Sequence, residues 1–349
     1  MADYFDYLNK FGGVTFEQQT ISIVDAAILA QLAYCDFGPQ TYGRLGDLTQ
    51  ADAKAMIAGT WQEARNLQLL LTLAKTPRYQ NVHWLAAVDE FDPQRQQQFS
   101  AVTFQLTPDT YYLSFRGTRA SFVDWKEDFN LTFLDAIPSQ LAASKYFAEI
   151  ADYYPGNYYL GGHSKGGNLA TFAFAHAGEL QNYVQMVYNL DGPGLQHPLP
   201  PDPKILKLVP QSSLIGIILD PSQDFAVVHS TASGFNQHDL FSWETRQRDF
   251  VYLPALDVRS RYAQKLLNQW VESLDDDTKQ QALDAAYQVV QNTEQETFAD
   301  LAKQPASSAK AILSGLKDAD RSAWKTAAHG LAQAFIDNVP KPPHNKPEK

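Results

Sequence analysis

Hydrophobic positions recur along the first part of the chain with two different periods, which predicts helices followed by strands. Residues 24–32 carry apolar side chains at Val24, Ile28 and Leu32, which share one face of a helix. Residues 62–75 also have a helical composition. Three strand-like runs follow and predict an antiparallel meander, with a turn at 107–109 between the last two: 82–88, 99–106 and 111–115.

From about residue 139 onward, helix-like and strand-like segments alternate. We predict helices at 139–153 and 167–177, and strands at 157–161, 183–190, 205–209 and 225–228. Five prolines between residues 193 and 203 predict an irregular surface connection. Alternation of this kind is typical of an α/β fold with a mainly parallel sheet and helices on both faces.

The composition changes after about residue 256, where strand signals end and Ala, Gln, Asp and Lys dominate. Trp324, Ala328, Leu331 and Phe335 are spaced to share one face of a helix. We therefore expect three regions, which are a sheet domain at 1–255, a helical extension packed on it at 256–338, and a disordered tail at 339–349.

Composition and charge narrow the class of protein. Hydrophobic residues make up 44% of the 349 residues and charged residues 19%, which predicts a packed globular core. The net charge of −11 and the lack of any Lys/Arg run argue against nucleic-acid binding. The single cysteine, Cys35, excludes an intrachain disulfide and a cysteine-based metal site.

The amino terminus has neither a basic segment nor a continuous apolar one, so we expect no signal peptide. No uninterrupted apolar run reaches the ~18 residues that a membrane-spanning helix needs. These features predict a cytoplasmic protein without a membrane span, and they leave the oligomeric state open.

The motif Gly162-His163-Ser164-Lys165-Gly166 lies between a predicted strand and a predicted helix. This is the context of a nucleophile elbow, in which a serine projects from a sharp turn and the flanking glycines avoid collisions with the neighbouring strand and helix. The glycine after Lys165 rules out a Walker A loop, and the spacing rules out a dinucleotide-binding fingerprint. The alternative is a glycine-rich turn in which Ser164 only caps a helix.

A nucleophilic serine needs a base, which on such a fold comes last in chain order. His238, in the loop after the last predicted strand, is the favoured base, and His229, at the end of that strand, is the second candidate. The alternative is that both are hydrogen-bonded loop histidines without a catalytic role.

The acid should lie between the serine and the base in the sequence. Asp191 directly follows the predicted strand 183–190, and the carboxyl ends of parallel strands form the active-site edge of such sheets. Asp220 and Asp224 are the other candidates. Asp191 can also be interpreted as a residue that only organises the turn after its strand.

Two backbone donors are expected to hold an oxyanion. One is the N–H of Lys165, which follows the serine, and the other is the N–H of Thr118, which follows a predicted strand and a glycine. We interpret Arg116 as structural, paired with Asp124 or Asp128.

These motifs together resemble class 3 (fungal-type) lipases, in their oxyanion strand Phe115-Arg116-Gly117-Thr118 and in the elbow. The fuller pattern is similar to a bacterial family of uncharacterised α/β-hydrolases related to these lipases; it adds Asp191-Gly192-Pro193-Gly194, the segment 209–216, and Gln237-His238-Asp239. The resemblance implies an α/β-hydrolase fold, serine-dependent ester hydrolysis and no cofactor, and we assign no metal site. It implies Ser164 as nucleophile, His238 as base, and Thr118 and Lys165 as oxyanion donors.

One departure from class 3 lipases concerns the acid, which in that group follows the strand after next. Here Gln211-Ser212-Ser213 follows that strand and offers no carboxylate. Asp191 instead resembles the acid position of pancreatic-type lipases. The leading hypothesis is hydrolysis of a small carboxylic ester. The alternatives are an amidase, thioesterase or acyltransferase that uses the same residues, and a non-catalytic binding protein that keeps the fold.

Overall fold

The computed structural model describes residues 2–38, 42–95, 97–118, 127, 130–131, 134–220, 224–258 and 260–261. The chain divides after Asp257 into two units, Met1–Asp257 and Val258–Lys349. Nearly all of the second unit lies outside the described residues, and so do the expected helical face of Trp324, Ala328, Leu331 and Phe335 and the expected tail at 339–349.

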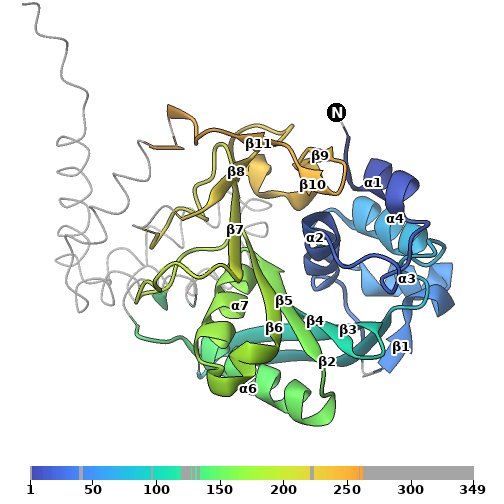
Figure 1. The fold of residues 1–349 in the computed structure, drawn as a ribbon, viewed down its shortest axis with the longest axis horizontal. Coiled ribbons are helices and arrows are strands. Elements are labelled where there is room, and N and C mark those ends of the chain that lie inside the picture. The colour runs from blue at the N-terminus through green and yellow to red at the C-terminus, as the bar shows by residue number, and fades with distance from the viewer. Residues whose placement is uncertain are drawn as a thin grey trace, which may run out of the picture. The chain divides into compact units, whose positions relative to one another are not determined.

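Within the described ranges, the strands form a nine-stranded sheet in the order β1-β2-β3-β4-β5-β6-β7-β8-β11 (Figure 1). Strands β1 to β4 pair antiparallel, β4 to β8 pair parallel, and β11 pairs antiparallel with β8. The bounds of these strands are Tyr42–Arg44, His83–Asp92, Gln97–Thr107, Thr110–Phe115, Asn157–His163, Val184–Leu190, Ile205–Pro210, Ala226–Val228 and Tyr252–Leu253. A separate pair joins β9 (Thr245–Arg246) and β10 (Asp249–Phe250).

The described helices pack on both faces of this sheet (Figure 1). The α-helices are α1 (Tyr4–Phe11), α2 (Ile23–Leu32), α3 (Gln50–Met56), α4 (Glu63–Leu73), α6 (Pro138–Tyr153) and α7 (Lys165–Ala175). The 3-10 helices are η1 (Leu45–Asp47), η2 (Gly178–Tyr183), η3 (Gly234–His238) and η4 (Leu240–Ser242). The predicted antiparallel meander, the parallel block and the helices on both faces are confirmed, and the arrangement is an α/β-hydrolase fold.

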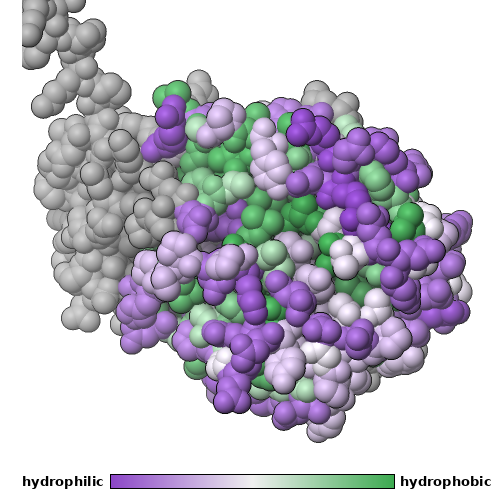
Figure 2. Space-filling model, viewed as in Figure 1, coloured by the Kyte–Doolittle hydropathy of each residue, from purple (hydrophilic) through white to green (hydrophobic). Residues whose placement is uncertain are grey.

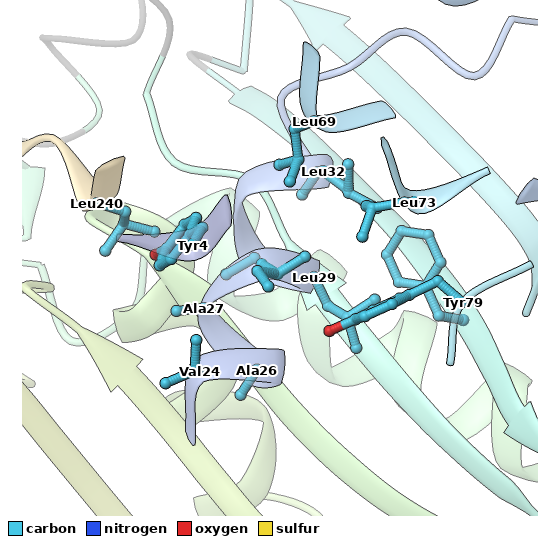
Figure 3. Close-up of a cluster of buried hydrophobic side chains, with 14 of the residues drawn as sticks. Tyr4, Val24, Ala26, Ala27, Leu29, Leu32, Leu69, Leu73, Tyr79 and Leu240 are labelled. Atoms are coloured by element: carbon cyan, nitrogen blue, oxygen red, sulfur yellow. The ribbon is translucent and has the colours of Figure 1, made fainter. Parts of the chain in front are cut away.

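Two apolar cores lie on opposite faces of the sheet, because successive strand side chains point to opposite sides. Tyr112 of β4 belongs to the core around α2, while the next residue, Leu113, belongs to the core around α6 and α7. Figure 3 shows α2 in the first core, with Tyr4, Leu69 and Leu240 near it. Figure 2 shows hydrophilic residues around the rim of one face and apolar residues gathered near its middle, between β7 and α2.

Helix α2, which the sequence predicts at 24–32, is buried around its whole circumference. All ten of its residues are buried, including Asp25 and Gln31. The Asp25 carboxylate accepts hydrogen bonds from the Arg78 guanidinium at 2.7 and 2.9 Å and from the Tyr79 hydroxyl at 2.6 Å. Burial of this charge is tolerated because the arginine pairs with it and several donors satisfy its oxygens.

Candidate active site

Ser164 lies at the turn between strand β5, which ends at His163, and helix α7, which begins at Lys165. Its backbone has φ 57° and ψ −132°, a conformation that costs ~1–3 kcal/mol for a residue with a side chain. A Cβ on Gly162 would lie 2.4 Å from the Phe115 carbonyl oxygen, and one on Gly166 would lie 2.0 Å from it. The strand–turn–helix and the need for both glycines are as the sequence predicts.

His238 and Asp191 form the hydrogen bond that their positions in the sequence predict. The Nδ1 atom of His238 lies 2.6 Å from Oδ2 of Asp191. Asp191 directly follows β6, and its side chain is 1% exposed, whereas the ring of His238 in η3 is 18% exposed. A fully buried carboxylate therefore pairs with a histidine that is partly exposed.

The second oxygen of Asp191 is bound by the loop that follows β7. The hydroxyl of Ser213 donates to Oδ1 at 2.5 Å, and the backbone N–H of Gly216 donates to the same oxygen at 3.2 Å. The sequence gives no sign that Ser213 is a donor to Asp191, because this contact depends on how the loop folds back over the neighbouring strand.

His163 links the elbow to the loop that carries His238. Its Nε2–H donates to the His238 carbonyl oxygen at 2.7 Å, and its Nδ1 lies 2.9 Å from the Tyr34 hydroxyl. Burial, with a contribution from the charge of His238, lowers the pKa of His163 well below its usual range. The ring is therefore neutral near pH 7. Because the carbonyl can only accept, the single ring proton is on Nε2 and Nδ1 accepts from Tyr34.

The two histidine rings are also in contact, with centroids 4.3 Å apart. His163 immediately precedes Ser164, so this contact and the hydrogen bond bring His238 to the elbow. The structure thus gathers Ser164, His238 and Asp191 in one place, although they come from three separate segments of the chain.

The other candidate acids and base have different partners. His229 Nδ1 lies 2.6 Å from a carboxylate oxygen of Glu244, and Asp220 forms a buried ion pair with the ammonium of Lys207 at 2.6 Å. Asp224 is exposed and precedes β8, which runs parallel to β7, so it lies at the amino-terminal edge of the parallel strands. The structure thus gives His229 and Asp220 pairs of their own and places Asp224 at the opposite edge of the sheet from Asp191.

The loop after β4 passes directly against the elbow. A Cβ on Gly117 would lie 3.0 Å from Cβ of Ser164 and 2.6 Å from the His163 carbonyl oxygen. Thr118 follows Gly117, so both predicted oxyanion donors belong to segments that meet at Ser164. The side chain of Lys165 is buried, and its ammonium lies 2.8 Å from the buried carboxylate of Glu127.

Arg116 forms an ion pair with a carboxylate that the sequence does not indicate as its partner. Its guanidinium donates to both carboxylate oxygens of Asp89 on β2, each at 2.9 Å. Asp124 and Asp128 lie outside the described residues. The described pair with Asp89 gives Arg116 a structural contact to β2, which the antiparallel meander places nearby, and the pairing predicted with Asp124 or Asp128 stays a prediction.

Comparison with known proteins decides the family. The model of the Mbeg1-like family matches residues 73–288, which is more than half of the chain. The chain belongs to the Mbeg1-like family. A search of curated protein sequences found no match.

Solved structures similar to this Mbeg1-like protein carry lipase titles. A structure titled as fungal lipases has 12% identity, covers 72% of this chain and 87% of its own, and has a TM-score of 0.40. The M37 lipase has 14% identity, with 55% and 68% covered and a TM-score of 0.35. The lipase from Rhizopus microsporus var. chinensis has 15% identity, with 61% and 74% covered and a TM-score of 0.34.

Two further findings concern the described residues of this Mbeg1-like chain. These residues contain no group of three or more His, Cys, Asp or Glu side chains that could hold a metal ion. In the same part of the chain, no helix has the length and apolar character needed to cross a membrane.

Proposed function

We propose that this Mbeg1-like protein is a serine hydrolase that cleaves small carboxylic esters in the cytoplasm through an acyl-enzyme on Ser164. The observation that carries the proposal is the 2.6 Å hydrogen bond between His238 and the buried carboxylate of Asp191, next to a serine in a strained strand-to-helix turn. A turn that merely capped a helix would need neither the strain nor the histidine–carboxylate pair.

The hydrogen bond to Asp191 sets the tautomer of His238 that the chemistry needs. An ionised carboxylate can only accept, so the proton of the neutral imidazole is on Nδ1. The lone pair is then on Nε2, on the opposite side of the ring from Asp191. In the proposed reaction this nitrogen accepts the proton of the Ser164 hydroxyl as general base.

The proposed reaction proceeds in two halves. Ser164 Oγ attacks the ester carbonyl carbon while His238 takes its proton, and the backbone N–H groups of Thr118 and Lys165 stabilise the oxyanion. The tetrahedral intermediate collapses to the acyl-enzyme, and His238 donates the proton to the departing alkoxide. Water, deprotonated by His238, then attacks the acyl carbonyl; as the bond to Ser164 Oγ breaks, His238 returns that proton to Oγ, and the carboxylic acid leaves.

A fluorophosphonate probe tests this proposal directly. The folded protein should gain the mass of one phosphonyl group, and the Ser164→Ala variant should gain none. The Ser230→Ala variant, which lacks a buried hydroxyl away from the elbow, should be labelled like the parent protein. Equal labelling of the parent and Ser164→Ala proteins would exclude Ser164 as the nucleophile.

The reaction class needs a separate measurement. Hydrolysis of p-nitrophenyl esters of increasing acyl length would define the acyl preference, and every rate should depend on Ser164. Added alcohol should divert acyl groups from water in proportion to its concentration, without a strong preference. A strong preference for alcohol over water would instead identify an acyltransferase, and a folded protein that is neither labelled nor active would be a binding protein.

A further inference from the structure

The loop after β7 surrounds the carboxylate of Asp191. Ser213 and Gly216 both donate to Oδ1, and the Gly216 N–H also lies 3.1 Å from the Ser213 hydroxyl oxygen. A Cβ on Gly216 would lie 2.4 Å from Oδ1, so the backbone can approach the carboxylate only because residue 216 has no side chain. The loop is therefore shaped around this carboxylate.

The same loop is bound to the turn that carries His238. The backbone N–H of Ser212 donates to the side-chain oxygen of Gln237 at 2.9 Å, and the Gln237 amide donates back to the Ser212 hydroxyl at 3.0 Å. Gln237 directly precedes His238. Ser213 is thus held in register with both members of the histidine–carboxylate pair.

We propose that Ser213 is a positioning residue of the active site, which orients the Asp191 carboxylate and tunes the charge that His238 experiences. This inference rests on the proposed esterase function and adds a residue that supports the Ser164, His238 and Asp191 triad. Ser213 is 2% exposed, so it acts through Asp191 and not by contact with substrate.

The role of Ser213 follows from the fact that the two carboxylate oxygens of Asp191 accept hydrogen bonds from different donors. Oδ2 accepts from His238, and Oδ1 accepts from Ser213 and, over a longer distance, from Gly216. The side chain is 1% exposed, so water cannot replace a lost donor. Without the Ser213 hydroxyl, Oδ1 keeps only the long contact to Gly216, and more of the negative charge is left to attract a proton on His238.

Other titratable groups lie near Asp191 and His238 and contribute to the electrostatic potential at the His238 ring. The ammonium of Lys207 on β7 interacts with Asp191 and is itself paired with Asp220. Neutral His163 on β5 and the carboxylate of Asp239 face His238. None of these groups is altered when the Ser213 hydroxyl is removed, so a change in the titration of His238 reports on the contact between Ser213 and Asp191.

The test compares Ser213→Ala with Ser230→Ala, since both changes delete one hydroxyl from a buried serine, and Ser230 bonds to Ser242 and not to Asp191. The titration of the His238 ring is followed by NMR, with its signal assigned by its loss in His238→Gln. We expect Ser213→Ala to move the midpoint about half a pH unit upward, since a less neutralised carboxylate favours the imidazolium. Ser230→Ala should leave the midpoint unchanged.

Ester kinetics give the second measurement. Ser213→Ala should lower kcat about tenfold and leave KM unchanged, and the acid limb of kcat/KM should move upward with the NMR midpoint. If Ser213→Ala does not fold, Ser213→Cys fills the site with a somewhat larger group that is only a weak donor, and it should show the same upward shift.

If the His238 midpoint in Ser213→Ala equals the midpoint in Ser230→Ala, or lies below it, the proposed role of Ser213 is wrong. This outcome is distinct from failure of the proposed function, because the NMR titration needs no turnover. If the fluorophosphonate does not label Ser164 in the parent protein, the proposed esterase function is refuted, whatever the titration of His238 shows.

Discussion

Replacing Asp191 with Asn is expected to abolish most ester hydrolysis by reversing the tautomer of His238. The hydroxyl of Ser213 and the N–H of Gly216 both point at Oδ1, so the amide oxygen of the new side chain should stay there. Its NH₂ group must then face Nδ1 of His238, which can accept this bond only by giving up its own proton. The ring proton moves to Nε2, where it blocks transfer from Ser164.

The magnitude follows from this reversal. A triad acid changed to its amide loses ~10⁴ in kcat through the wrong tautomer, which corresponds to about 5 kcal/mol of transition-state stabilisation. Fluorophosphonate labelling should slow by a similar factor, because it uses the same base. Stability should change far less, since the amide is nearly the same size as the carboxylate and keeps the hydrogen bonds to its oxygen.

The assay compares kcat for a p-nitrophenyl ester among matched variants. Asp224→Asn changes an exposed carboxylate at the opposite edge of the sheet and should keep kcat within about twofold. Asp220→Asn removes the partner of buried Lys207 and should cost about 3–5 kcal/mol in stability, while it leaves the bond between His238 and Asp191 in place. A folded Asp191→Asn variant with kcat within tenfold of the parent would refute the tautomer argument.

Three further predictions concern the structure around the elbow. Gly166→Ala should abolish labelling and lower the melting temperature, because its Cβ would lie 2.0 Å from a carbonyl oxygen; normal labelling would contradict this. Glu127→Gln leaves the buried ammonium of Lys165 without its counter-charge and should cost about 3–5 kcal/mol in urea unfolding, whereas exposed Glu149→Gln should cost almost nothing. The lowered pKa of His163 means that the unfolded chain binds its proton more readily, so stability should fall as the pH drops below about 6.5. Melting curves of His163→Gln should depend less on pH, and an equal dependence would argue against a buried neutral ring.

The elbow and the placement of Asp191 could be predicted from the sequence because both depend on local rules. Ser164 needs only a strand, two glycines and a helix in succession, and these are consecutive in the chain. Asp191 needs only to follow a strand of the parallel block, since the carboxyl ends of parallel strands share one edge. The alternation of strands and helices establishes both conditions without knowledge of any long-range contact.

Other features could not be predicted in the same way, because they depend on contacts between distant segments or on elements too short to show a pattern. Asp89, which pairs with Arg116, belongs to a strand that continues to Asp92 through mostly acidic residues, beyond the end that its apolar pattern predicts. No helix is predicted at Tyr4–Phe11, although Asp3 and Asp6 form a capping box at its start and five of its eight residues are aromatic or apolar. Two helical turns are shorter than the window of about 11 residues over which an apolar period can be recognised, so the cap is the more useful evidence in the sequence.

The histidine of the site is held from two sides by groups with different tasks. On one side, Asp191 binds Nδ1 and is itself held by Ser213, so this side sets the proton position and the charge of the ring. On the other side, His163 donates to the His238 carbonyl and so fixes where the backbone of the loop lies relative to the elbow. Changes on the first side should therefore alter the pH profile and kcat, whereas loss of the His163 contact should displace the ring as a whole. Such displacement lowers the rate at every pH, because proton transfer requires hydrogen-bond distance between the base and the nucleophile.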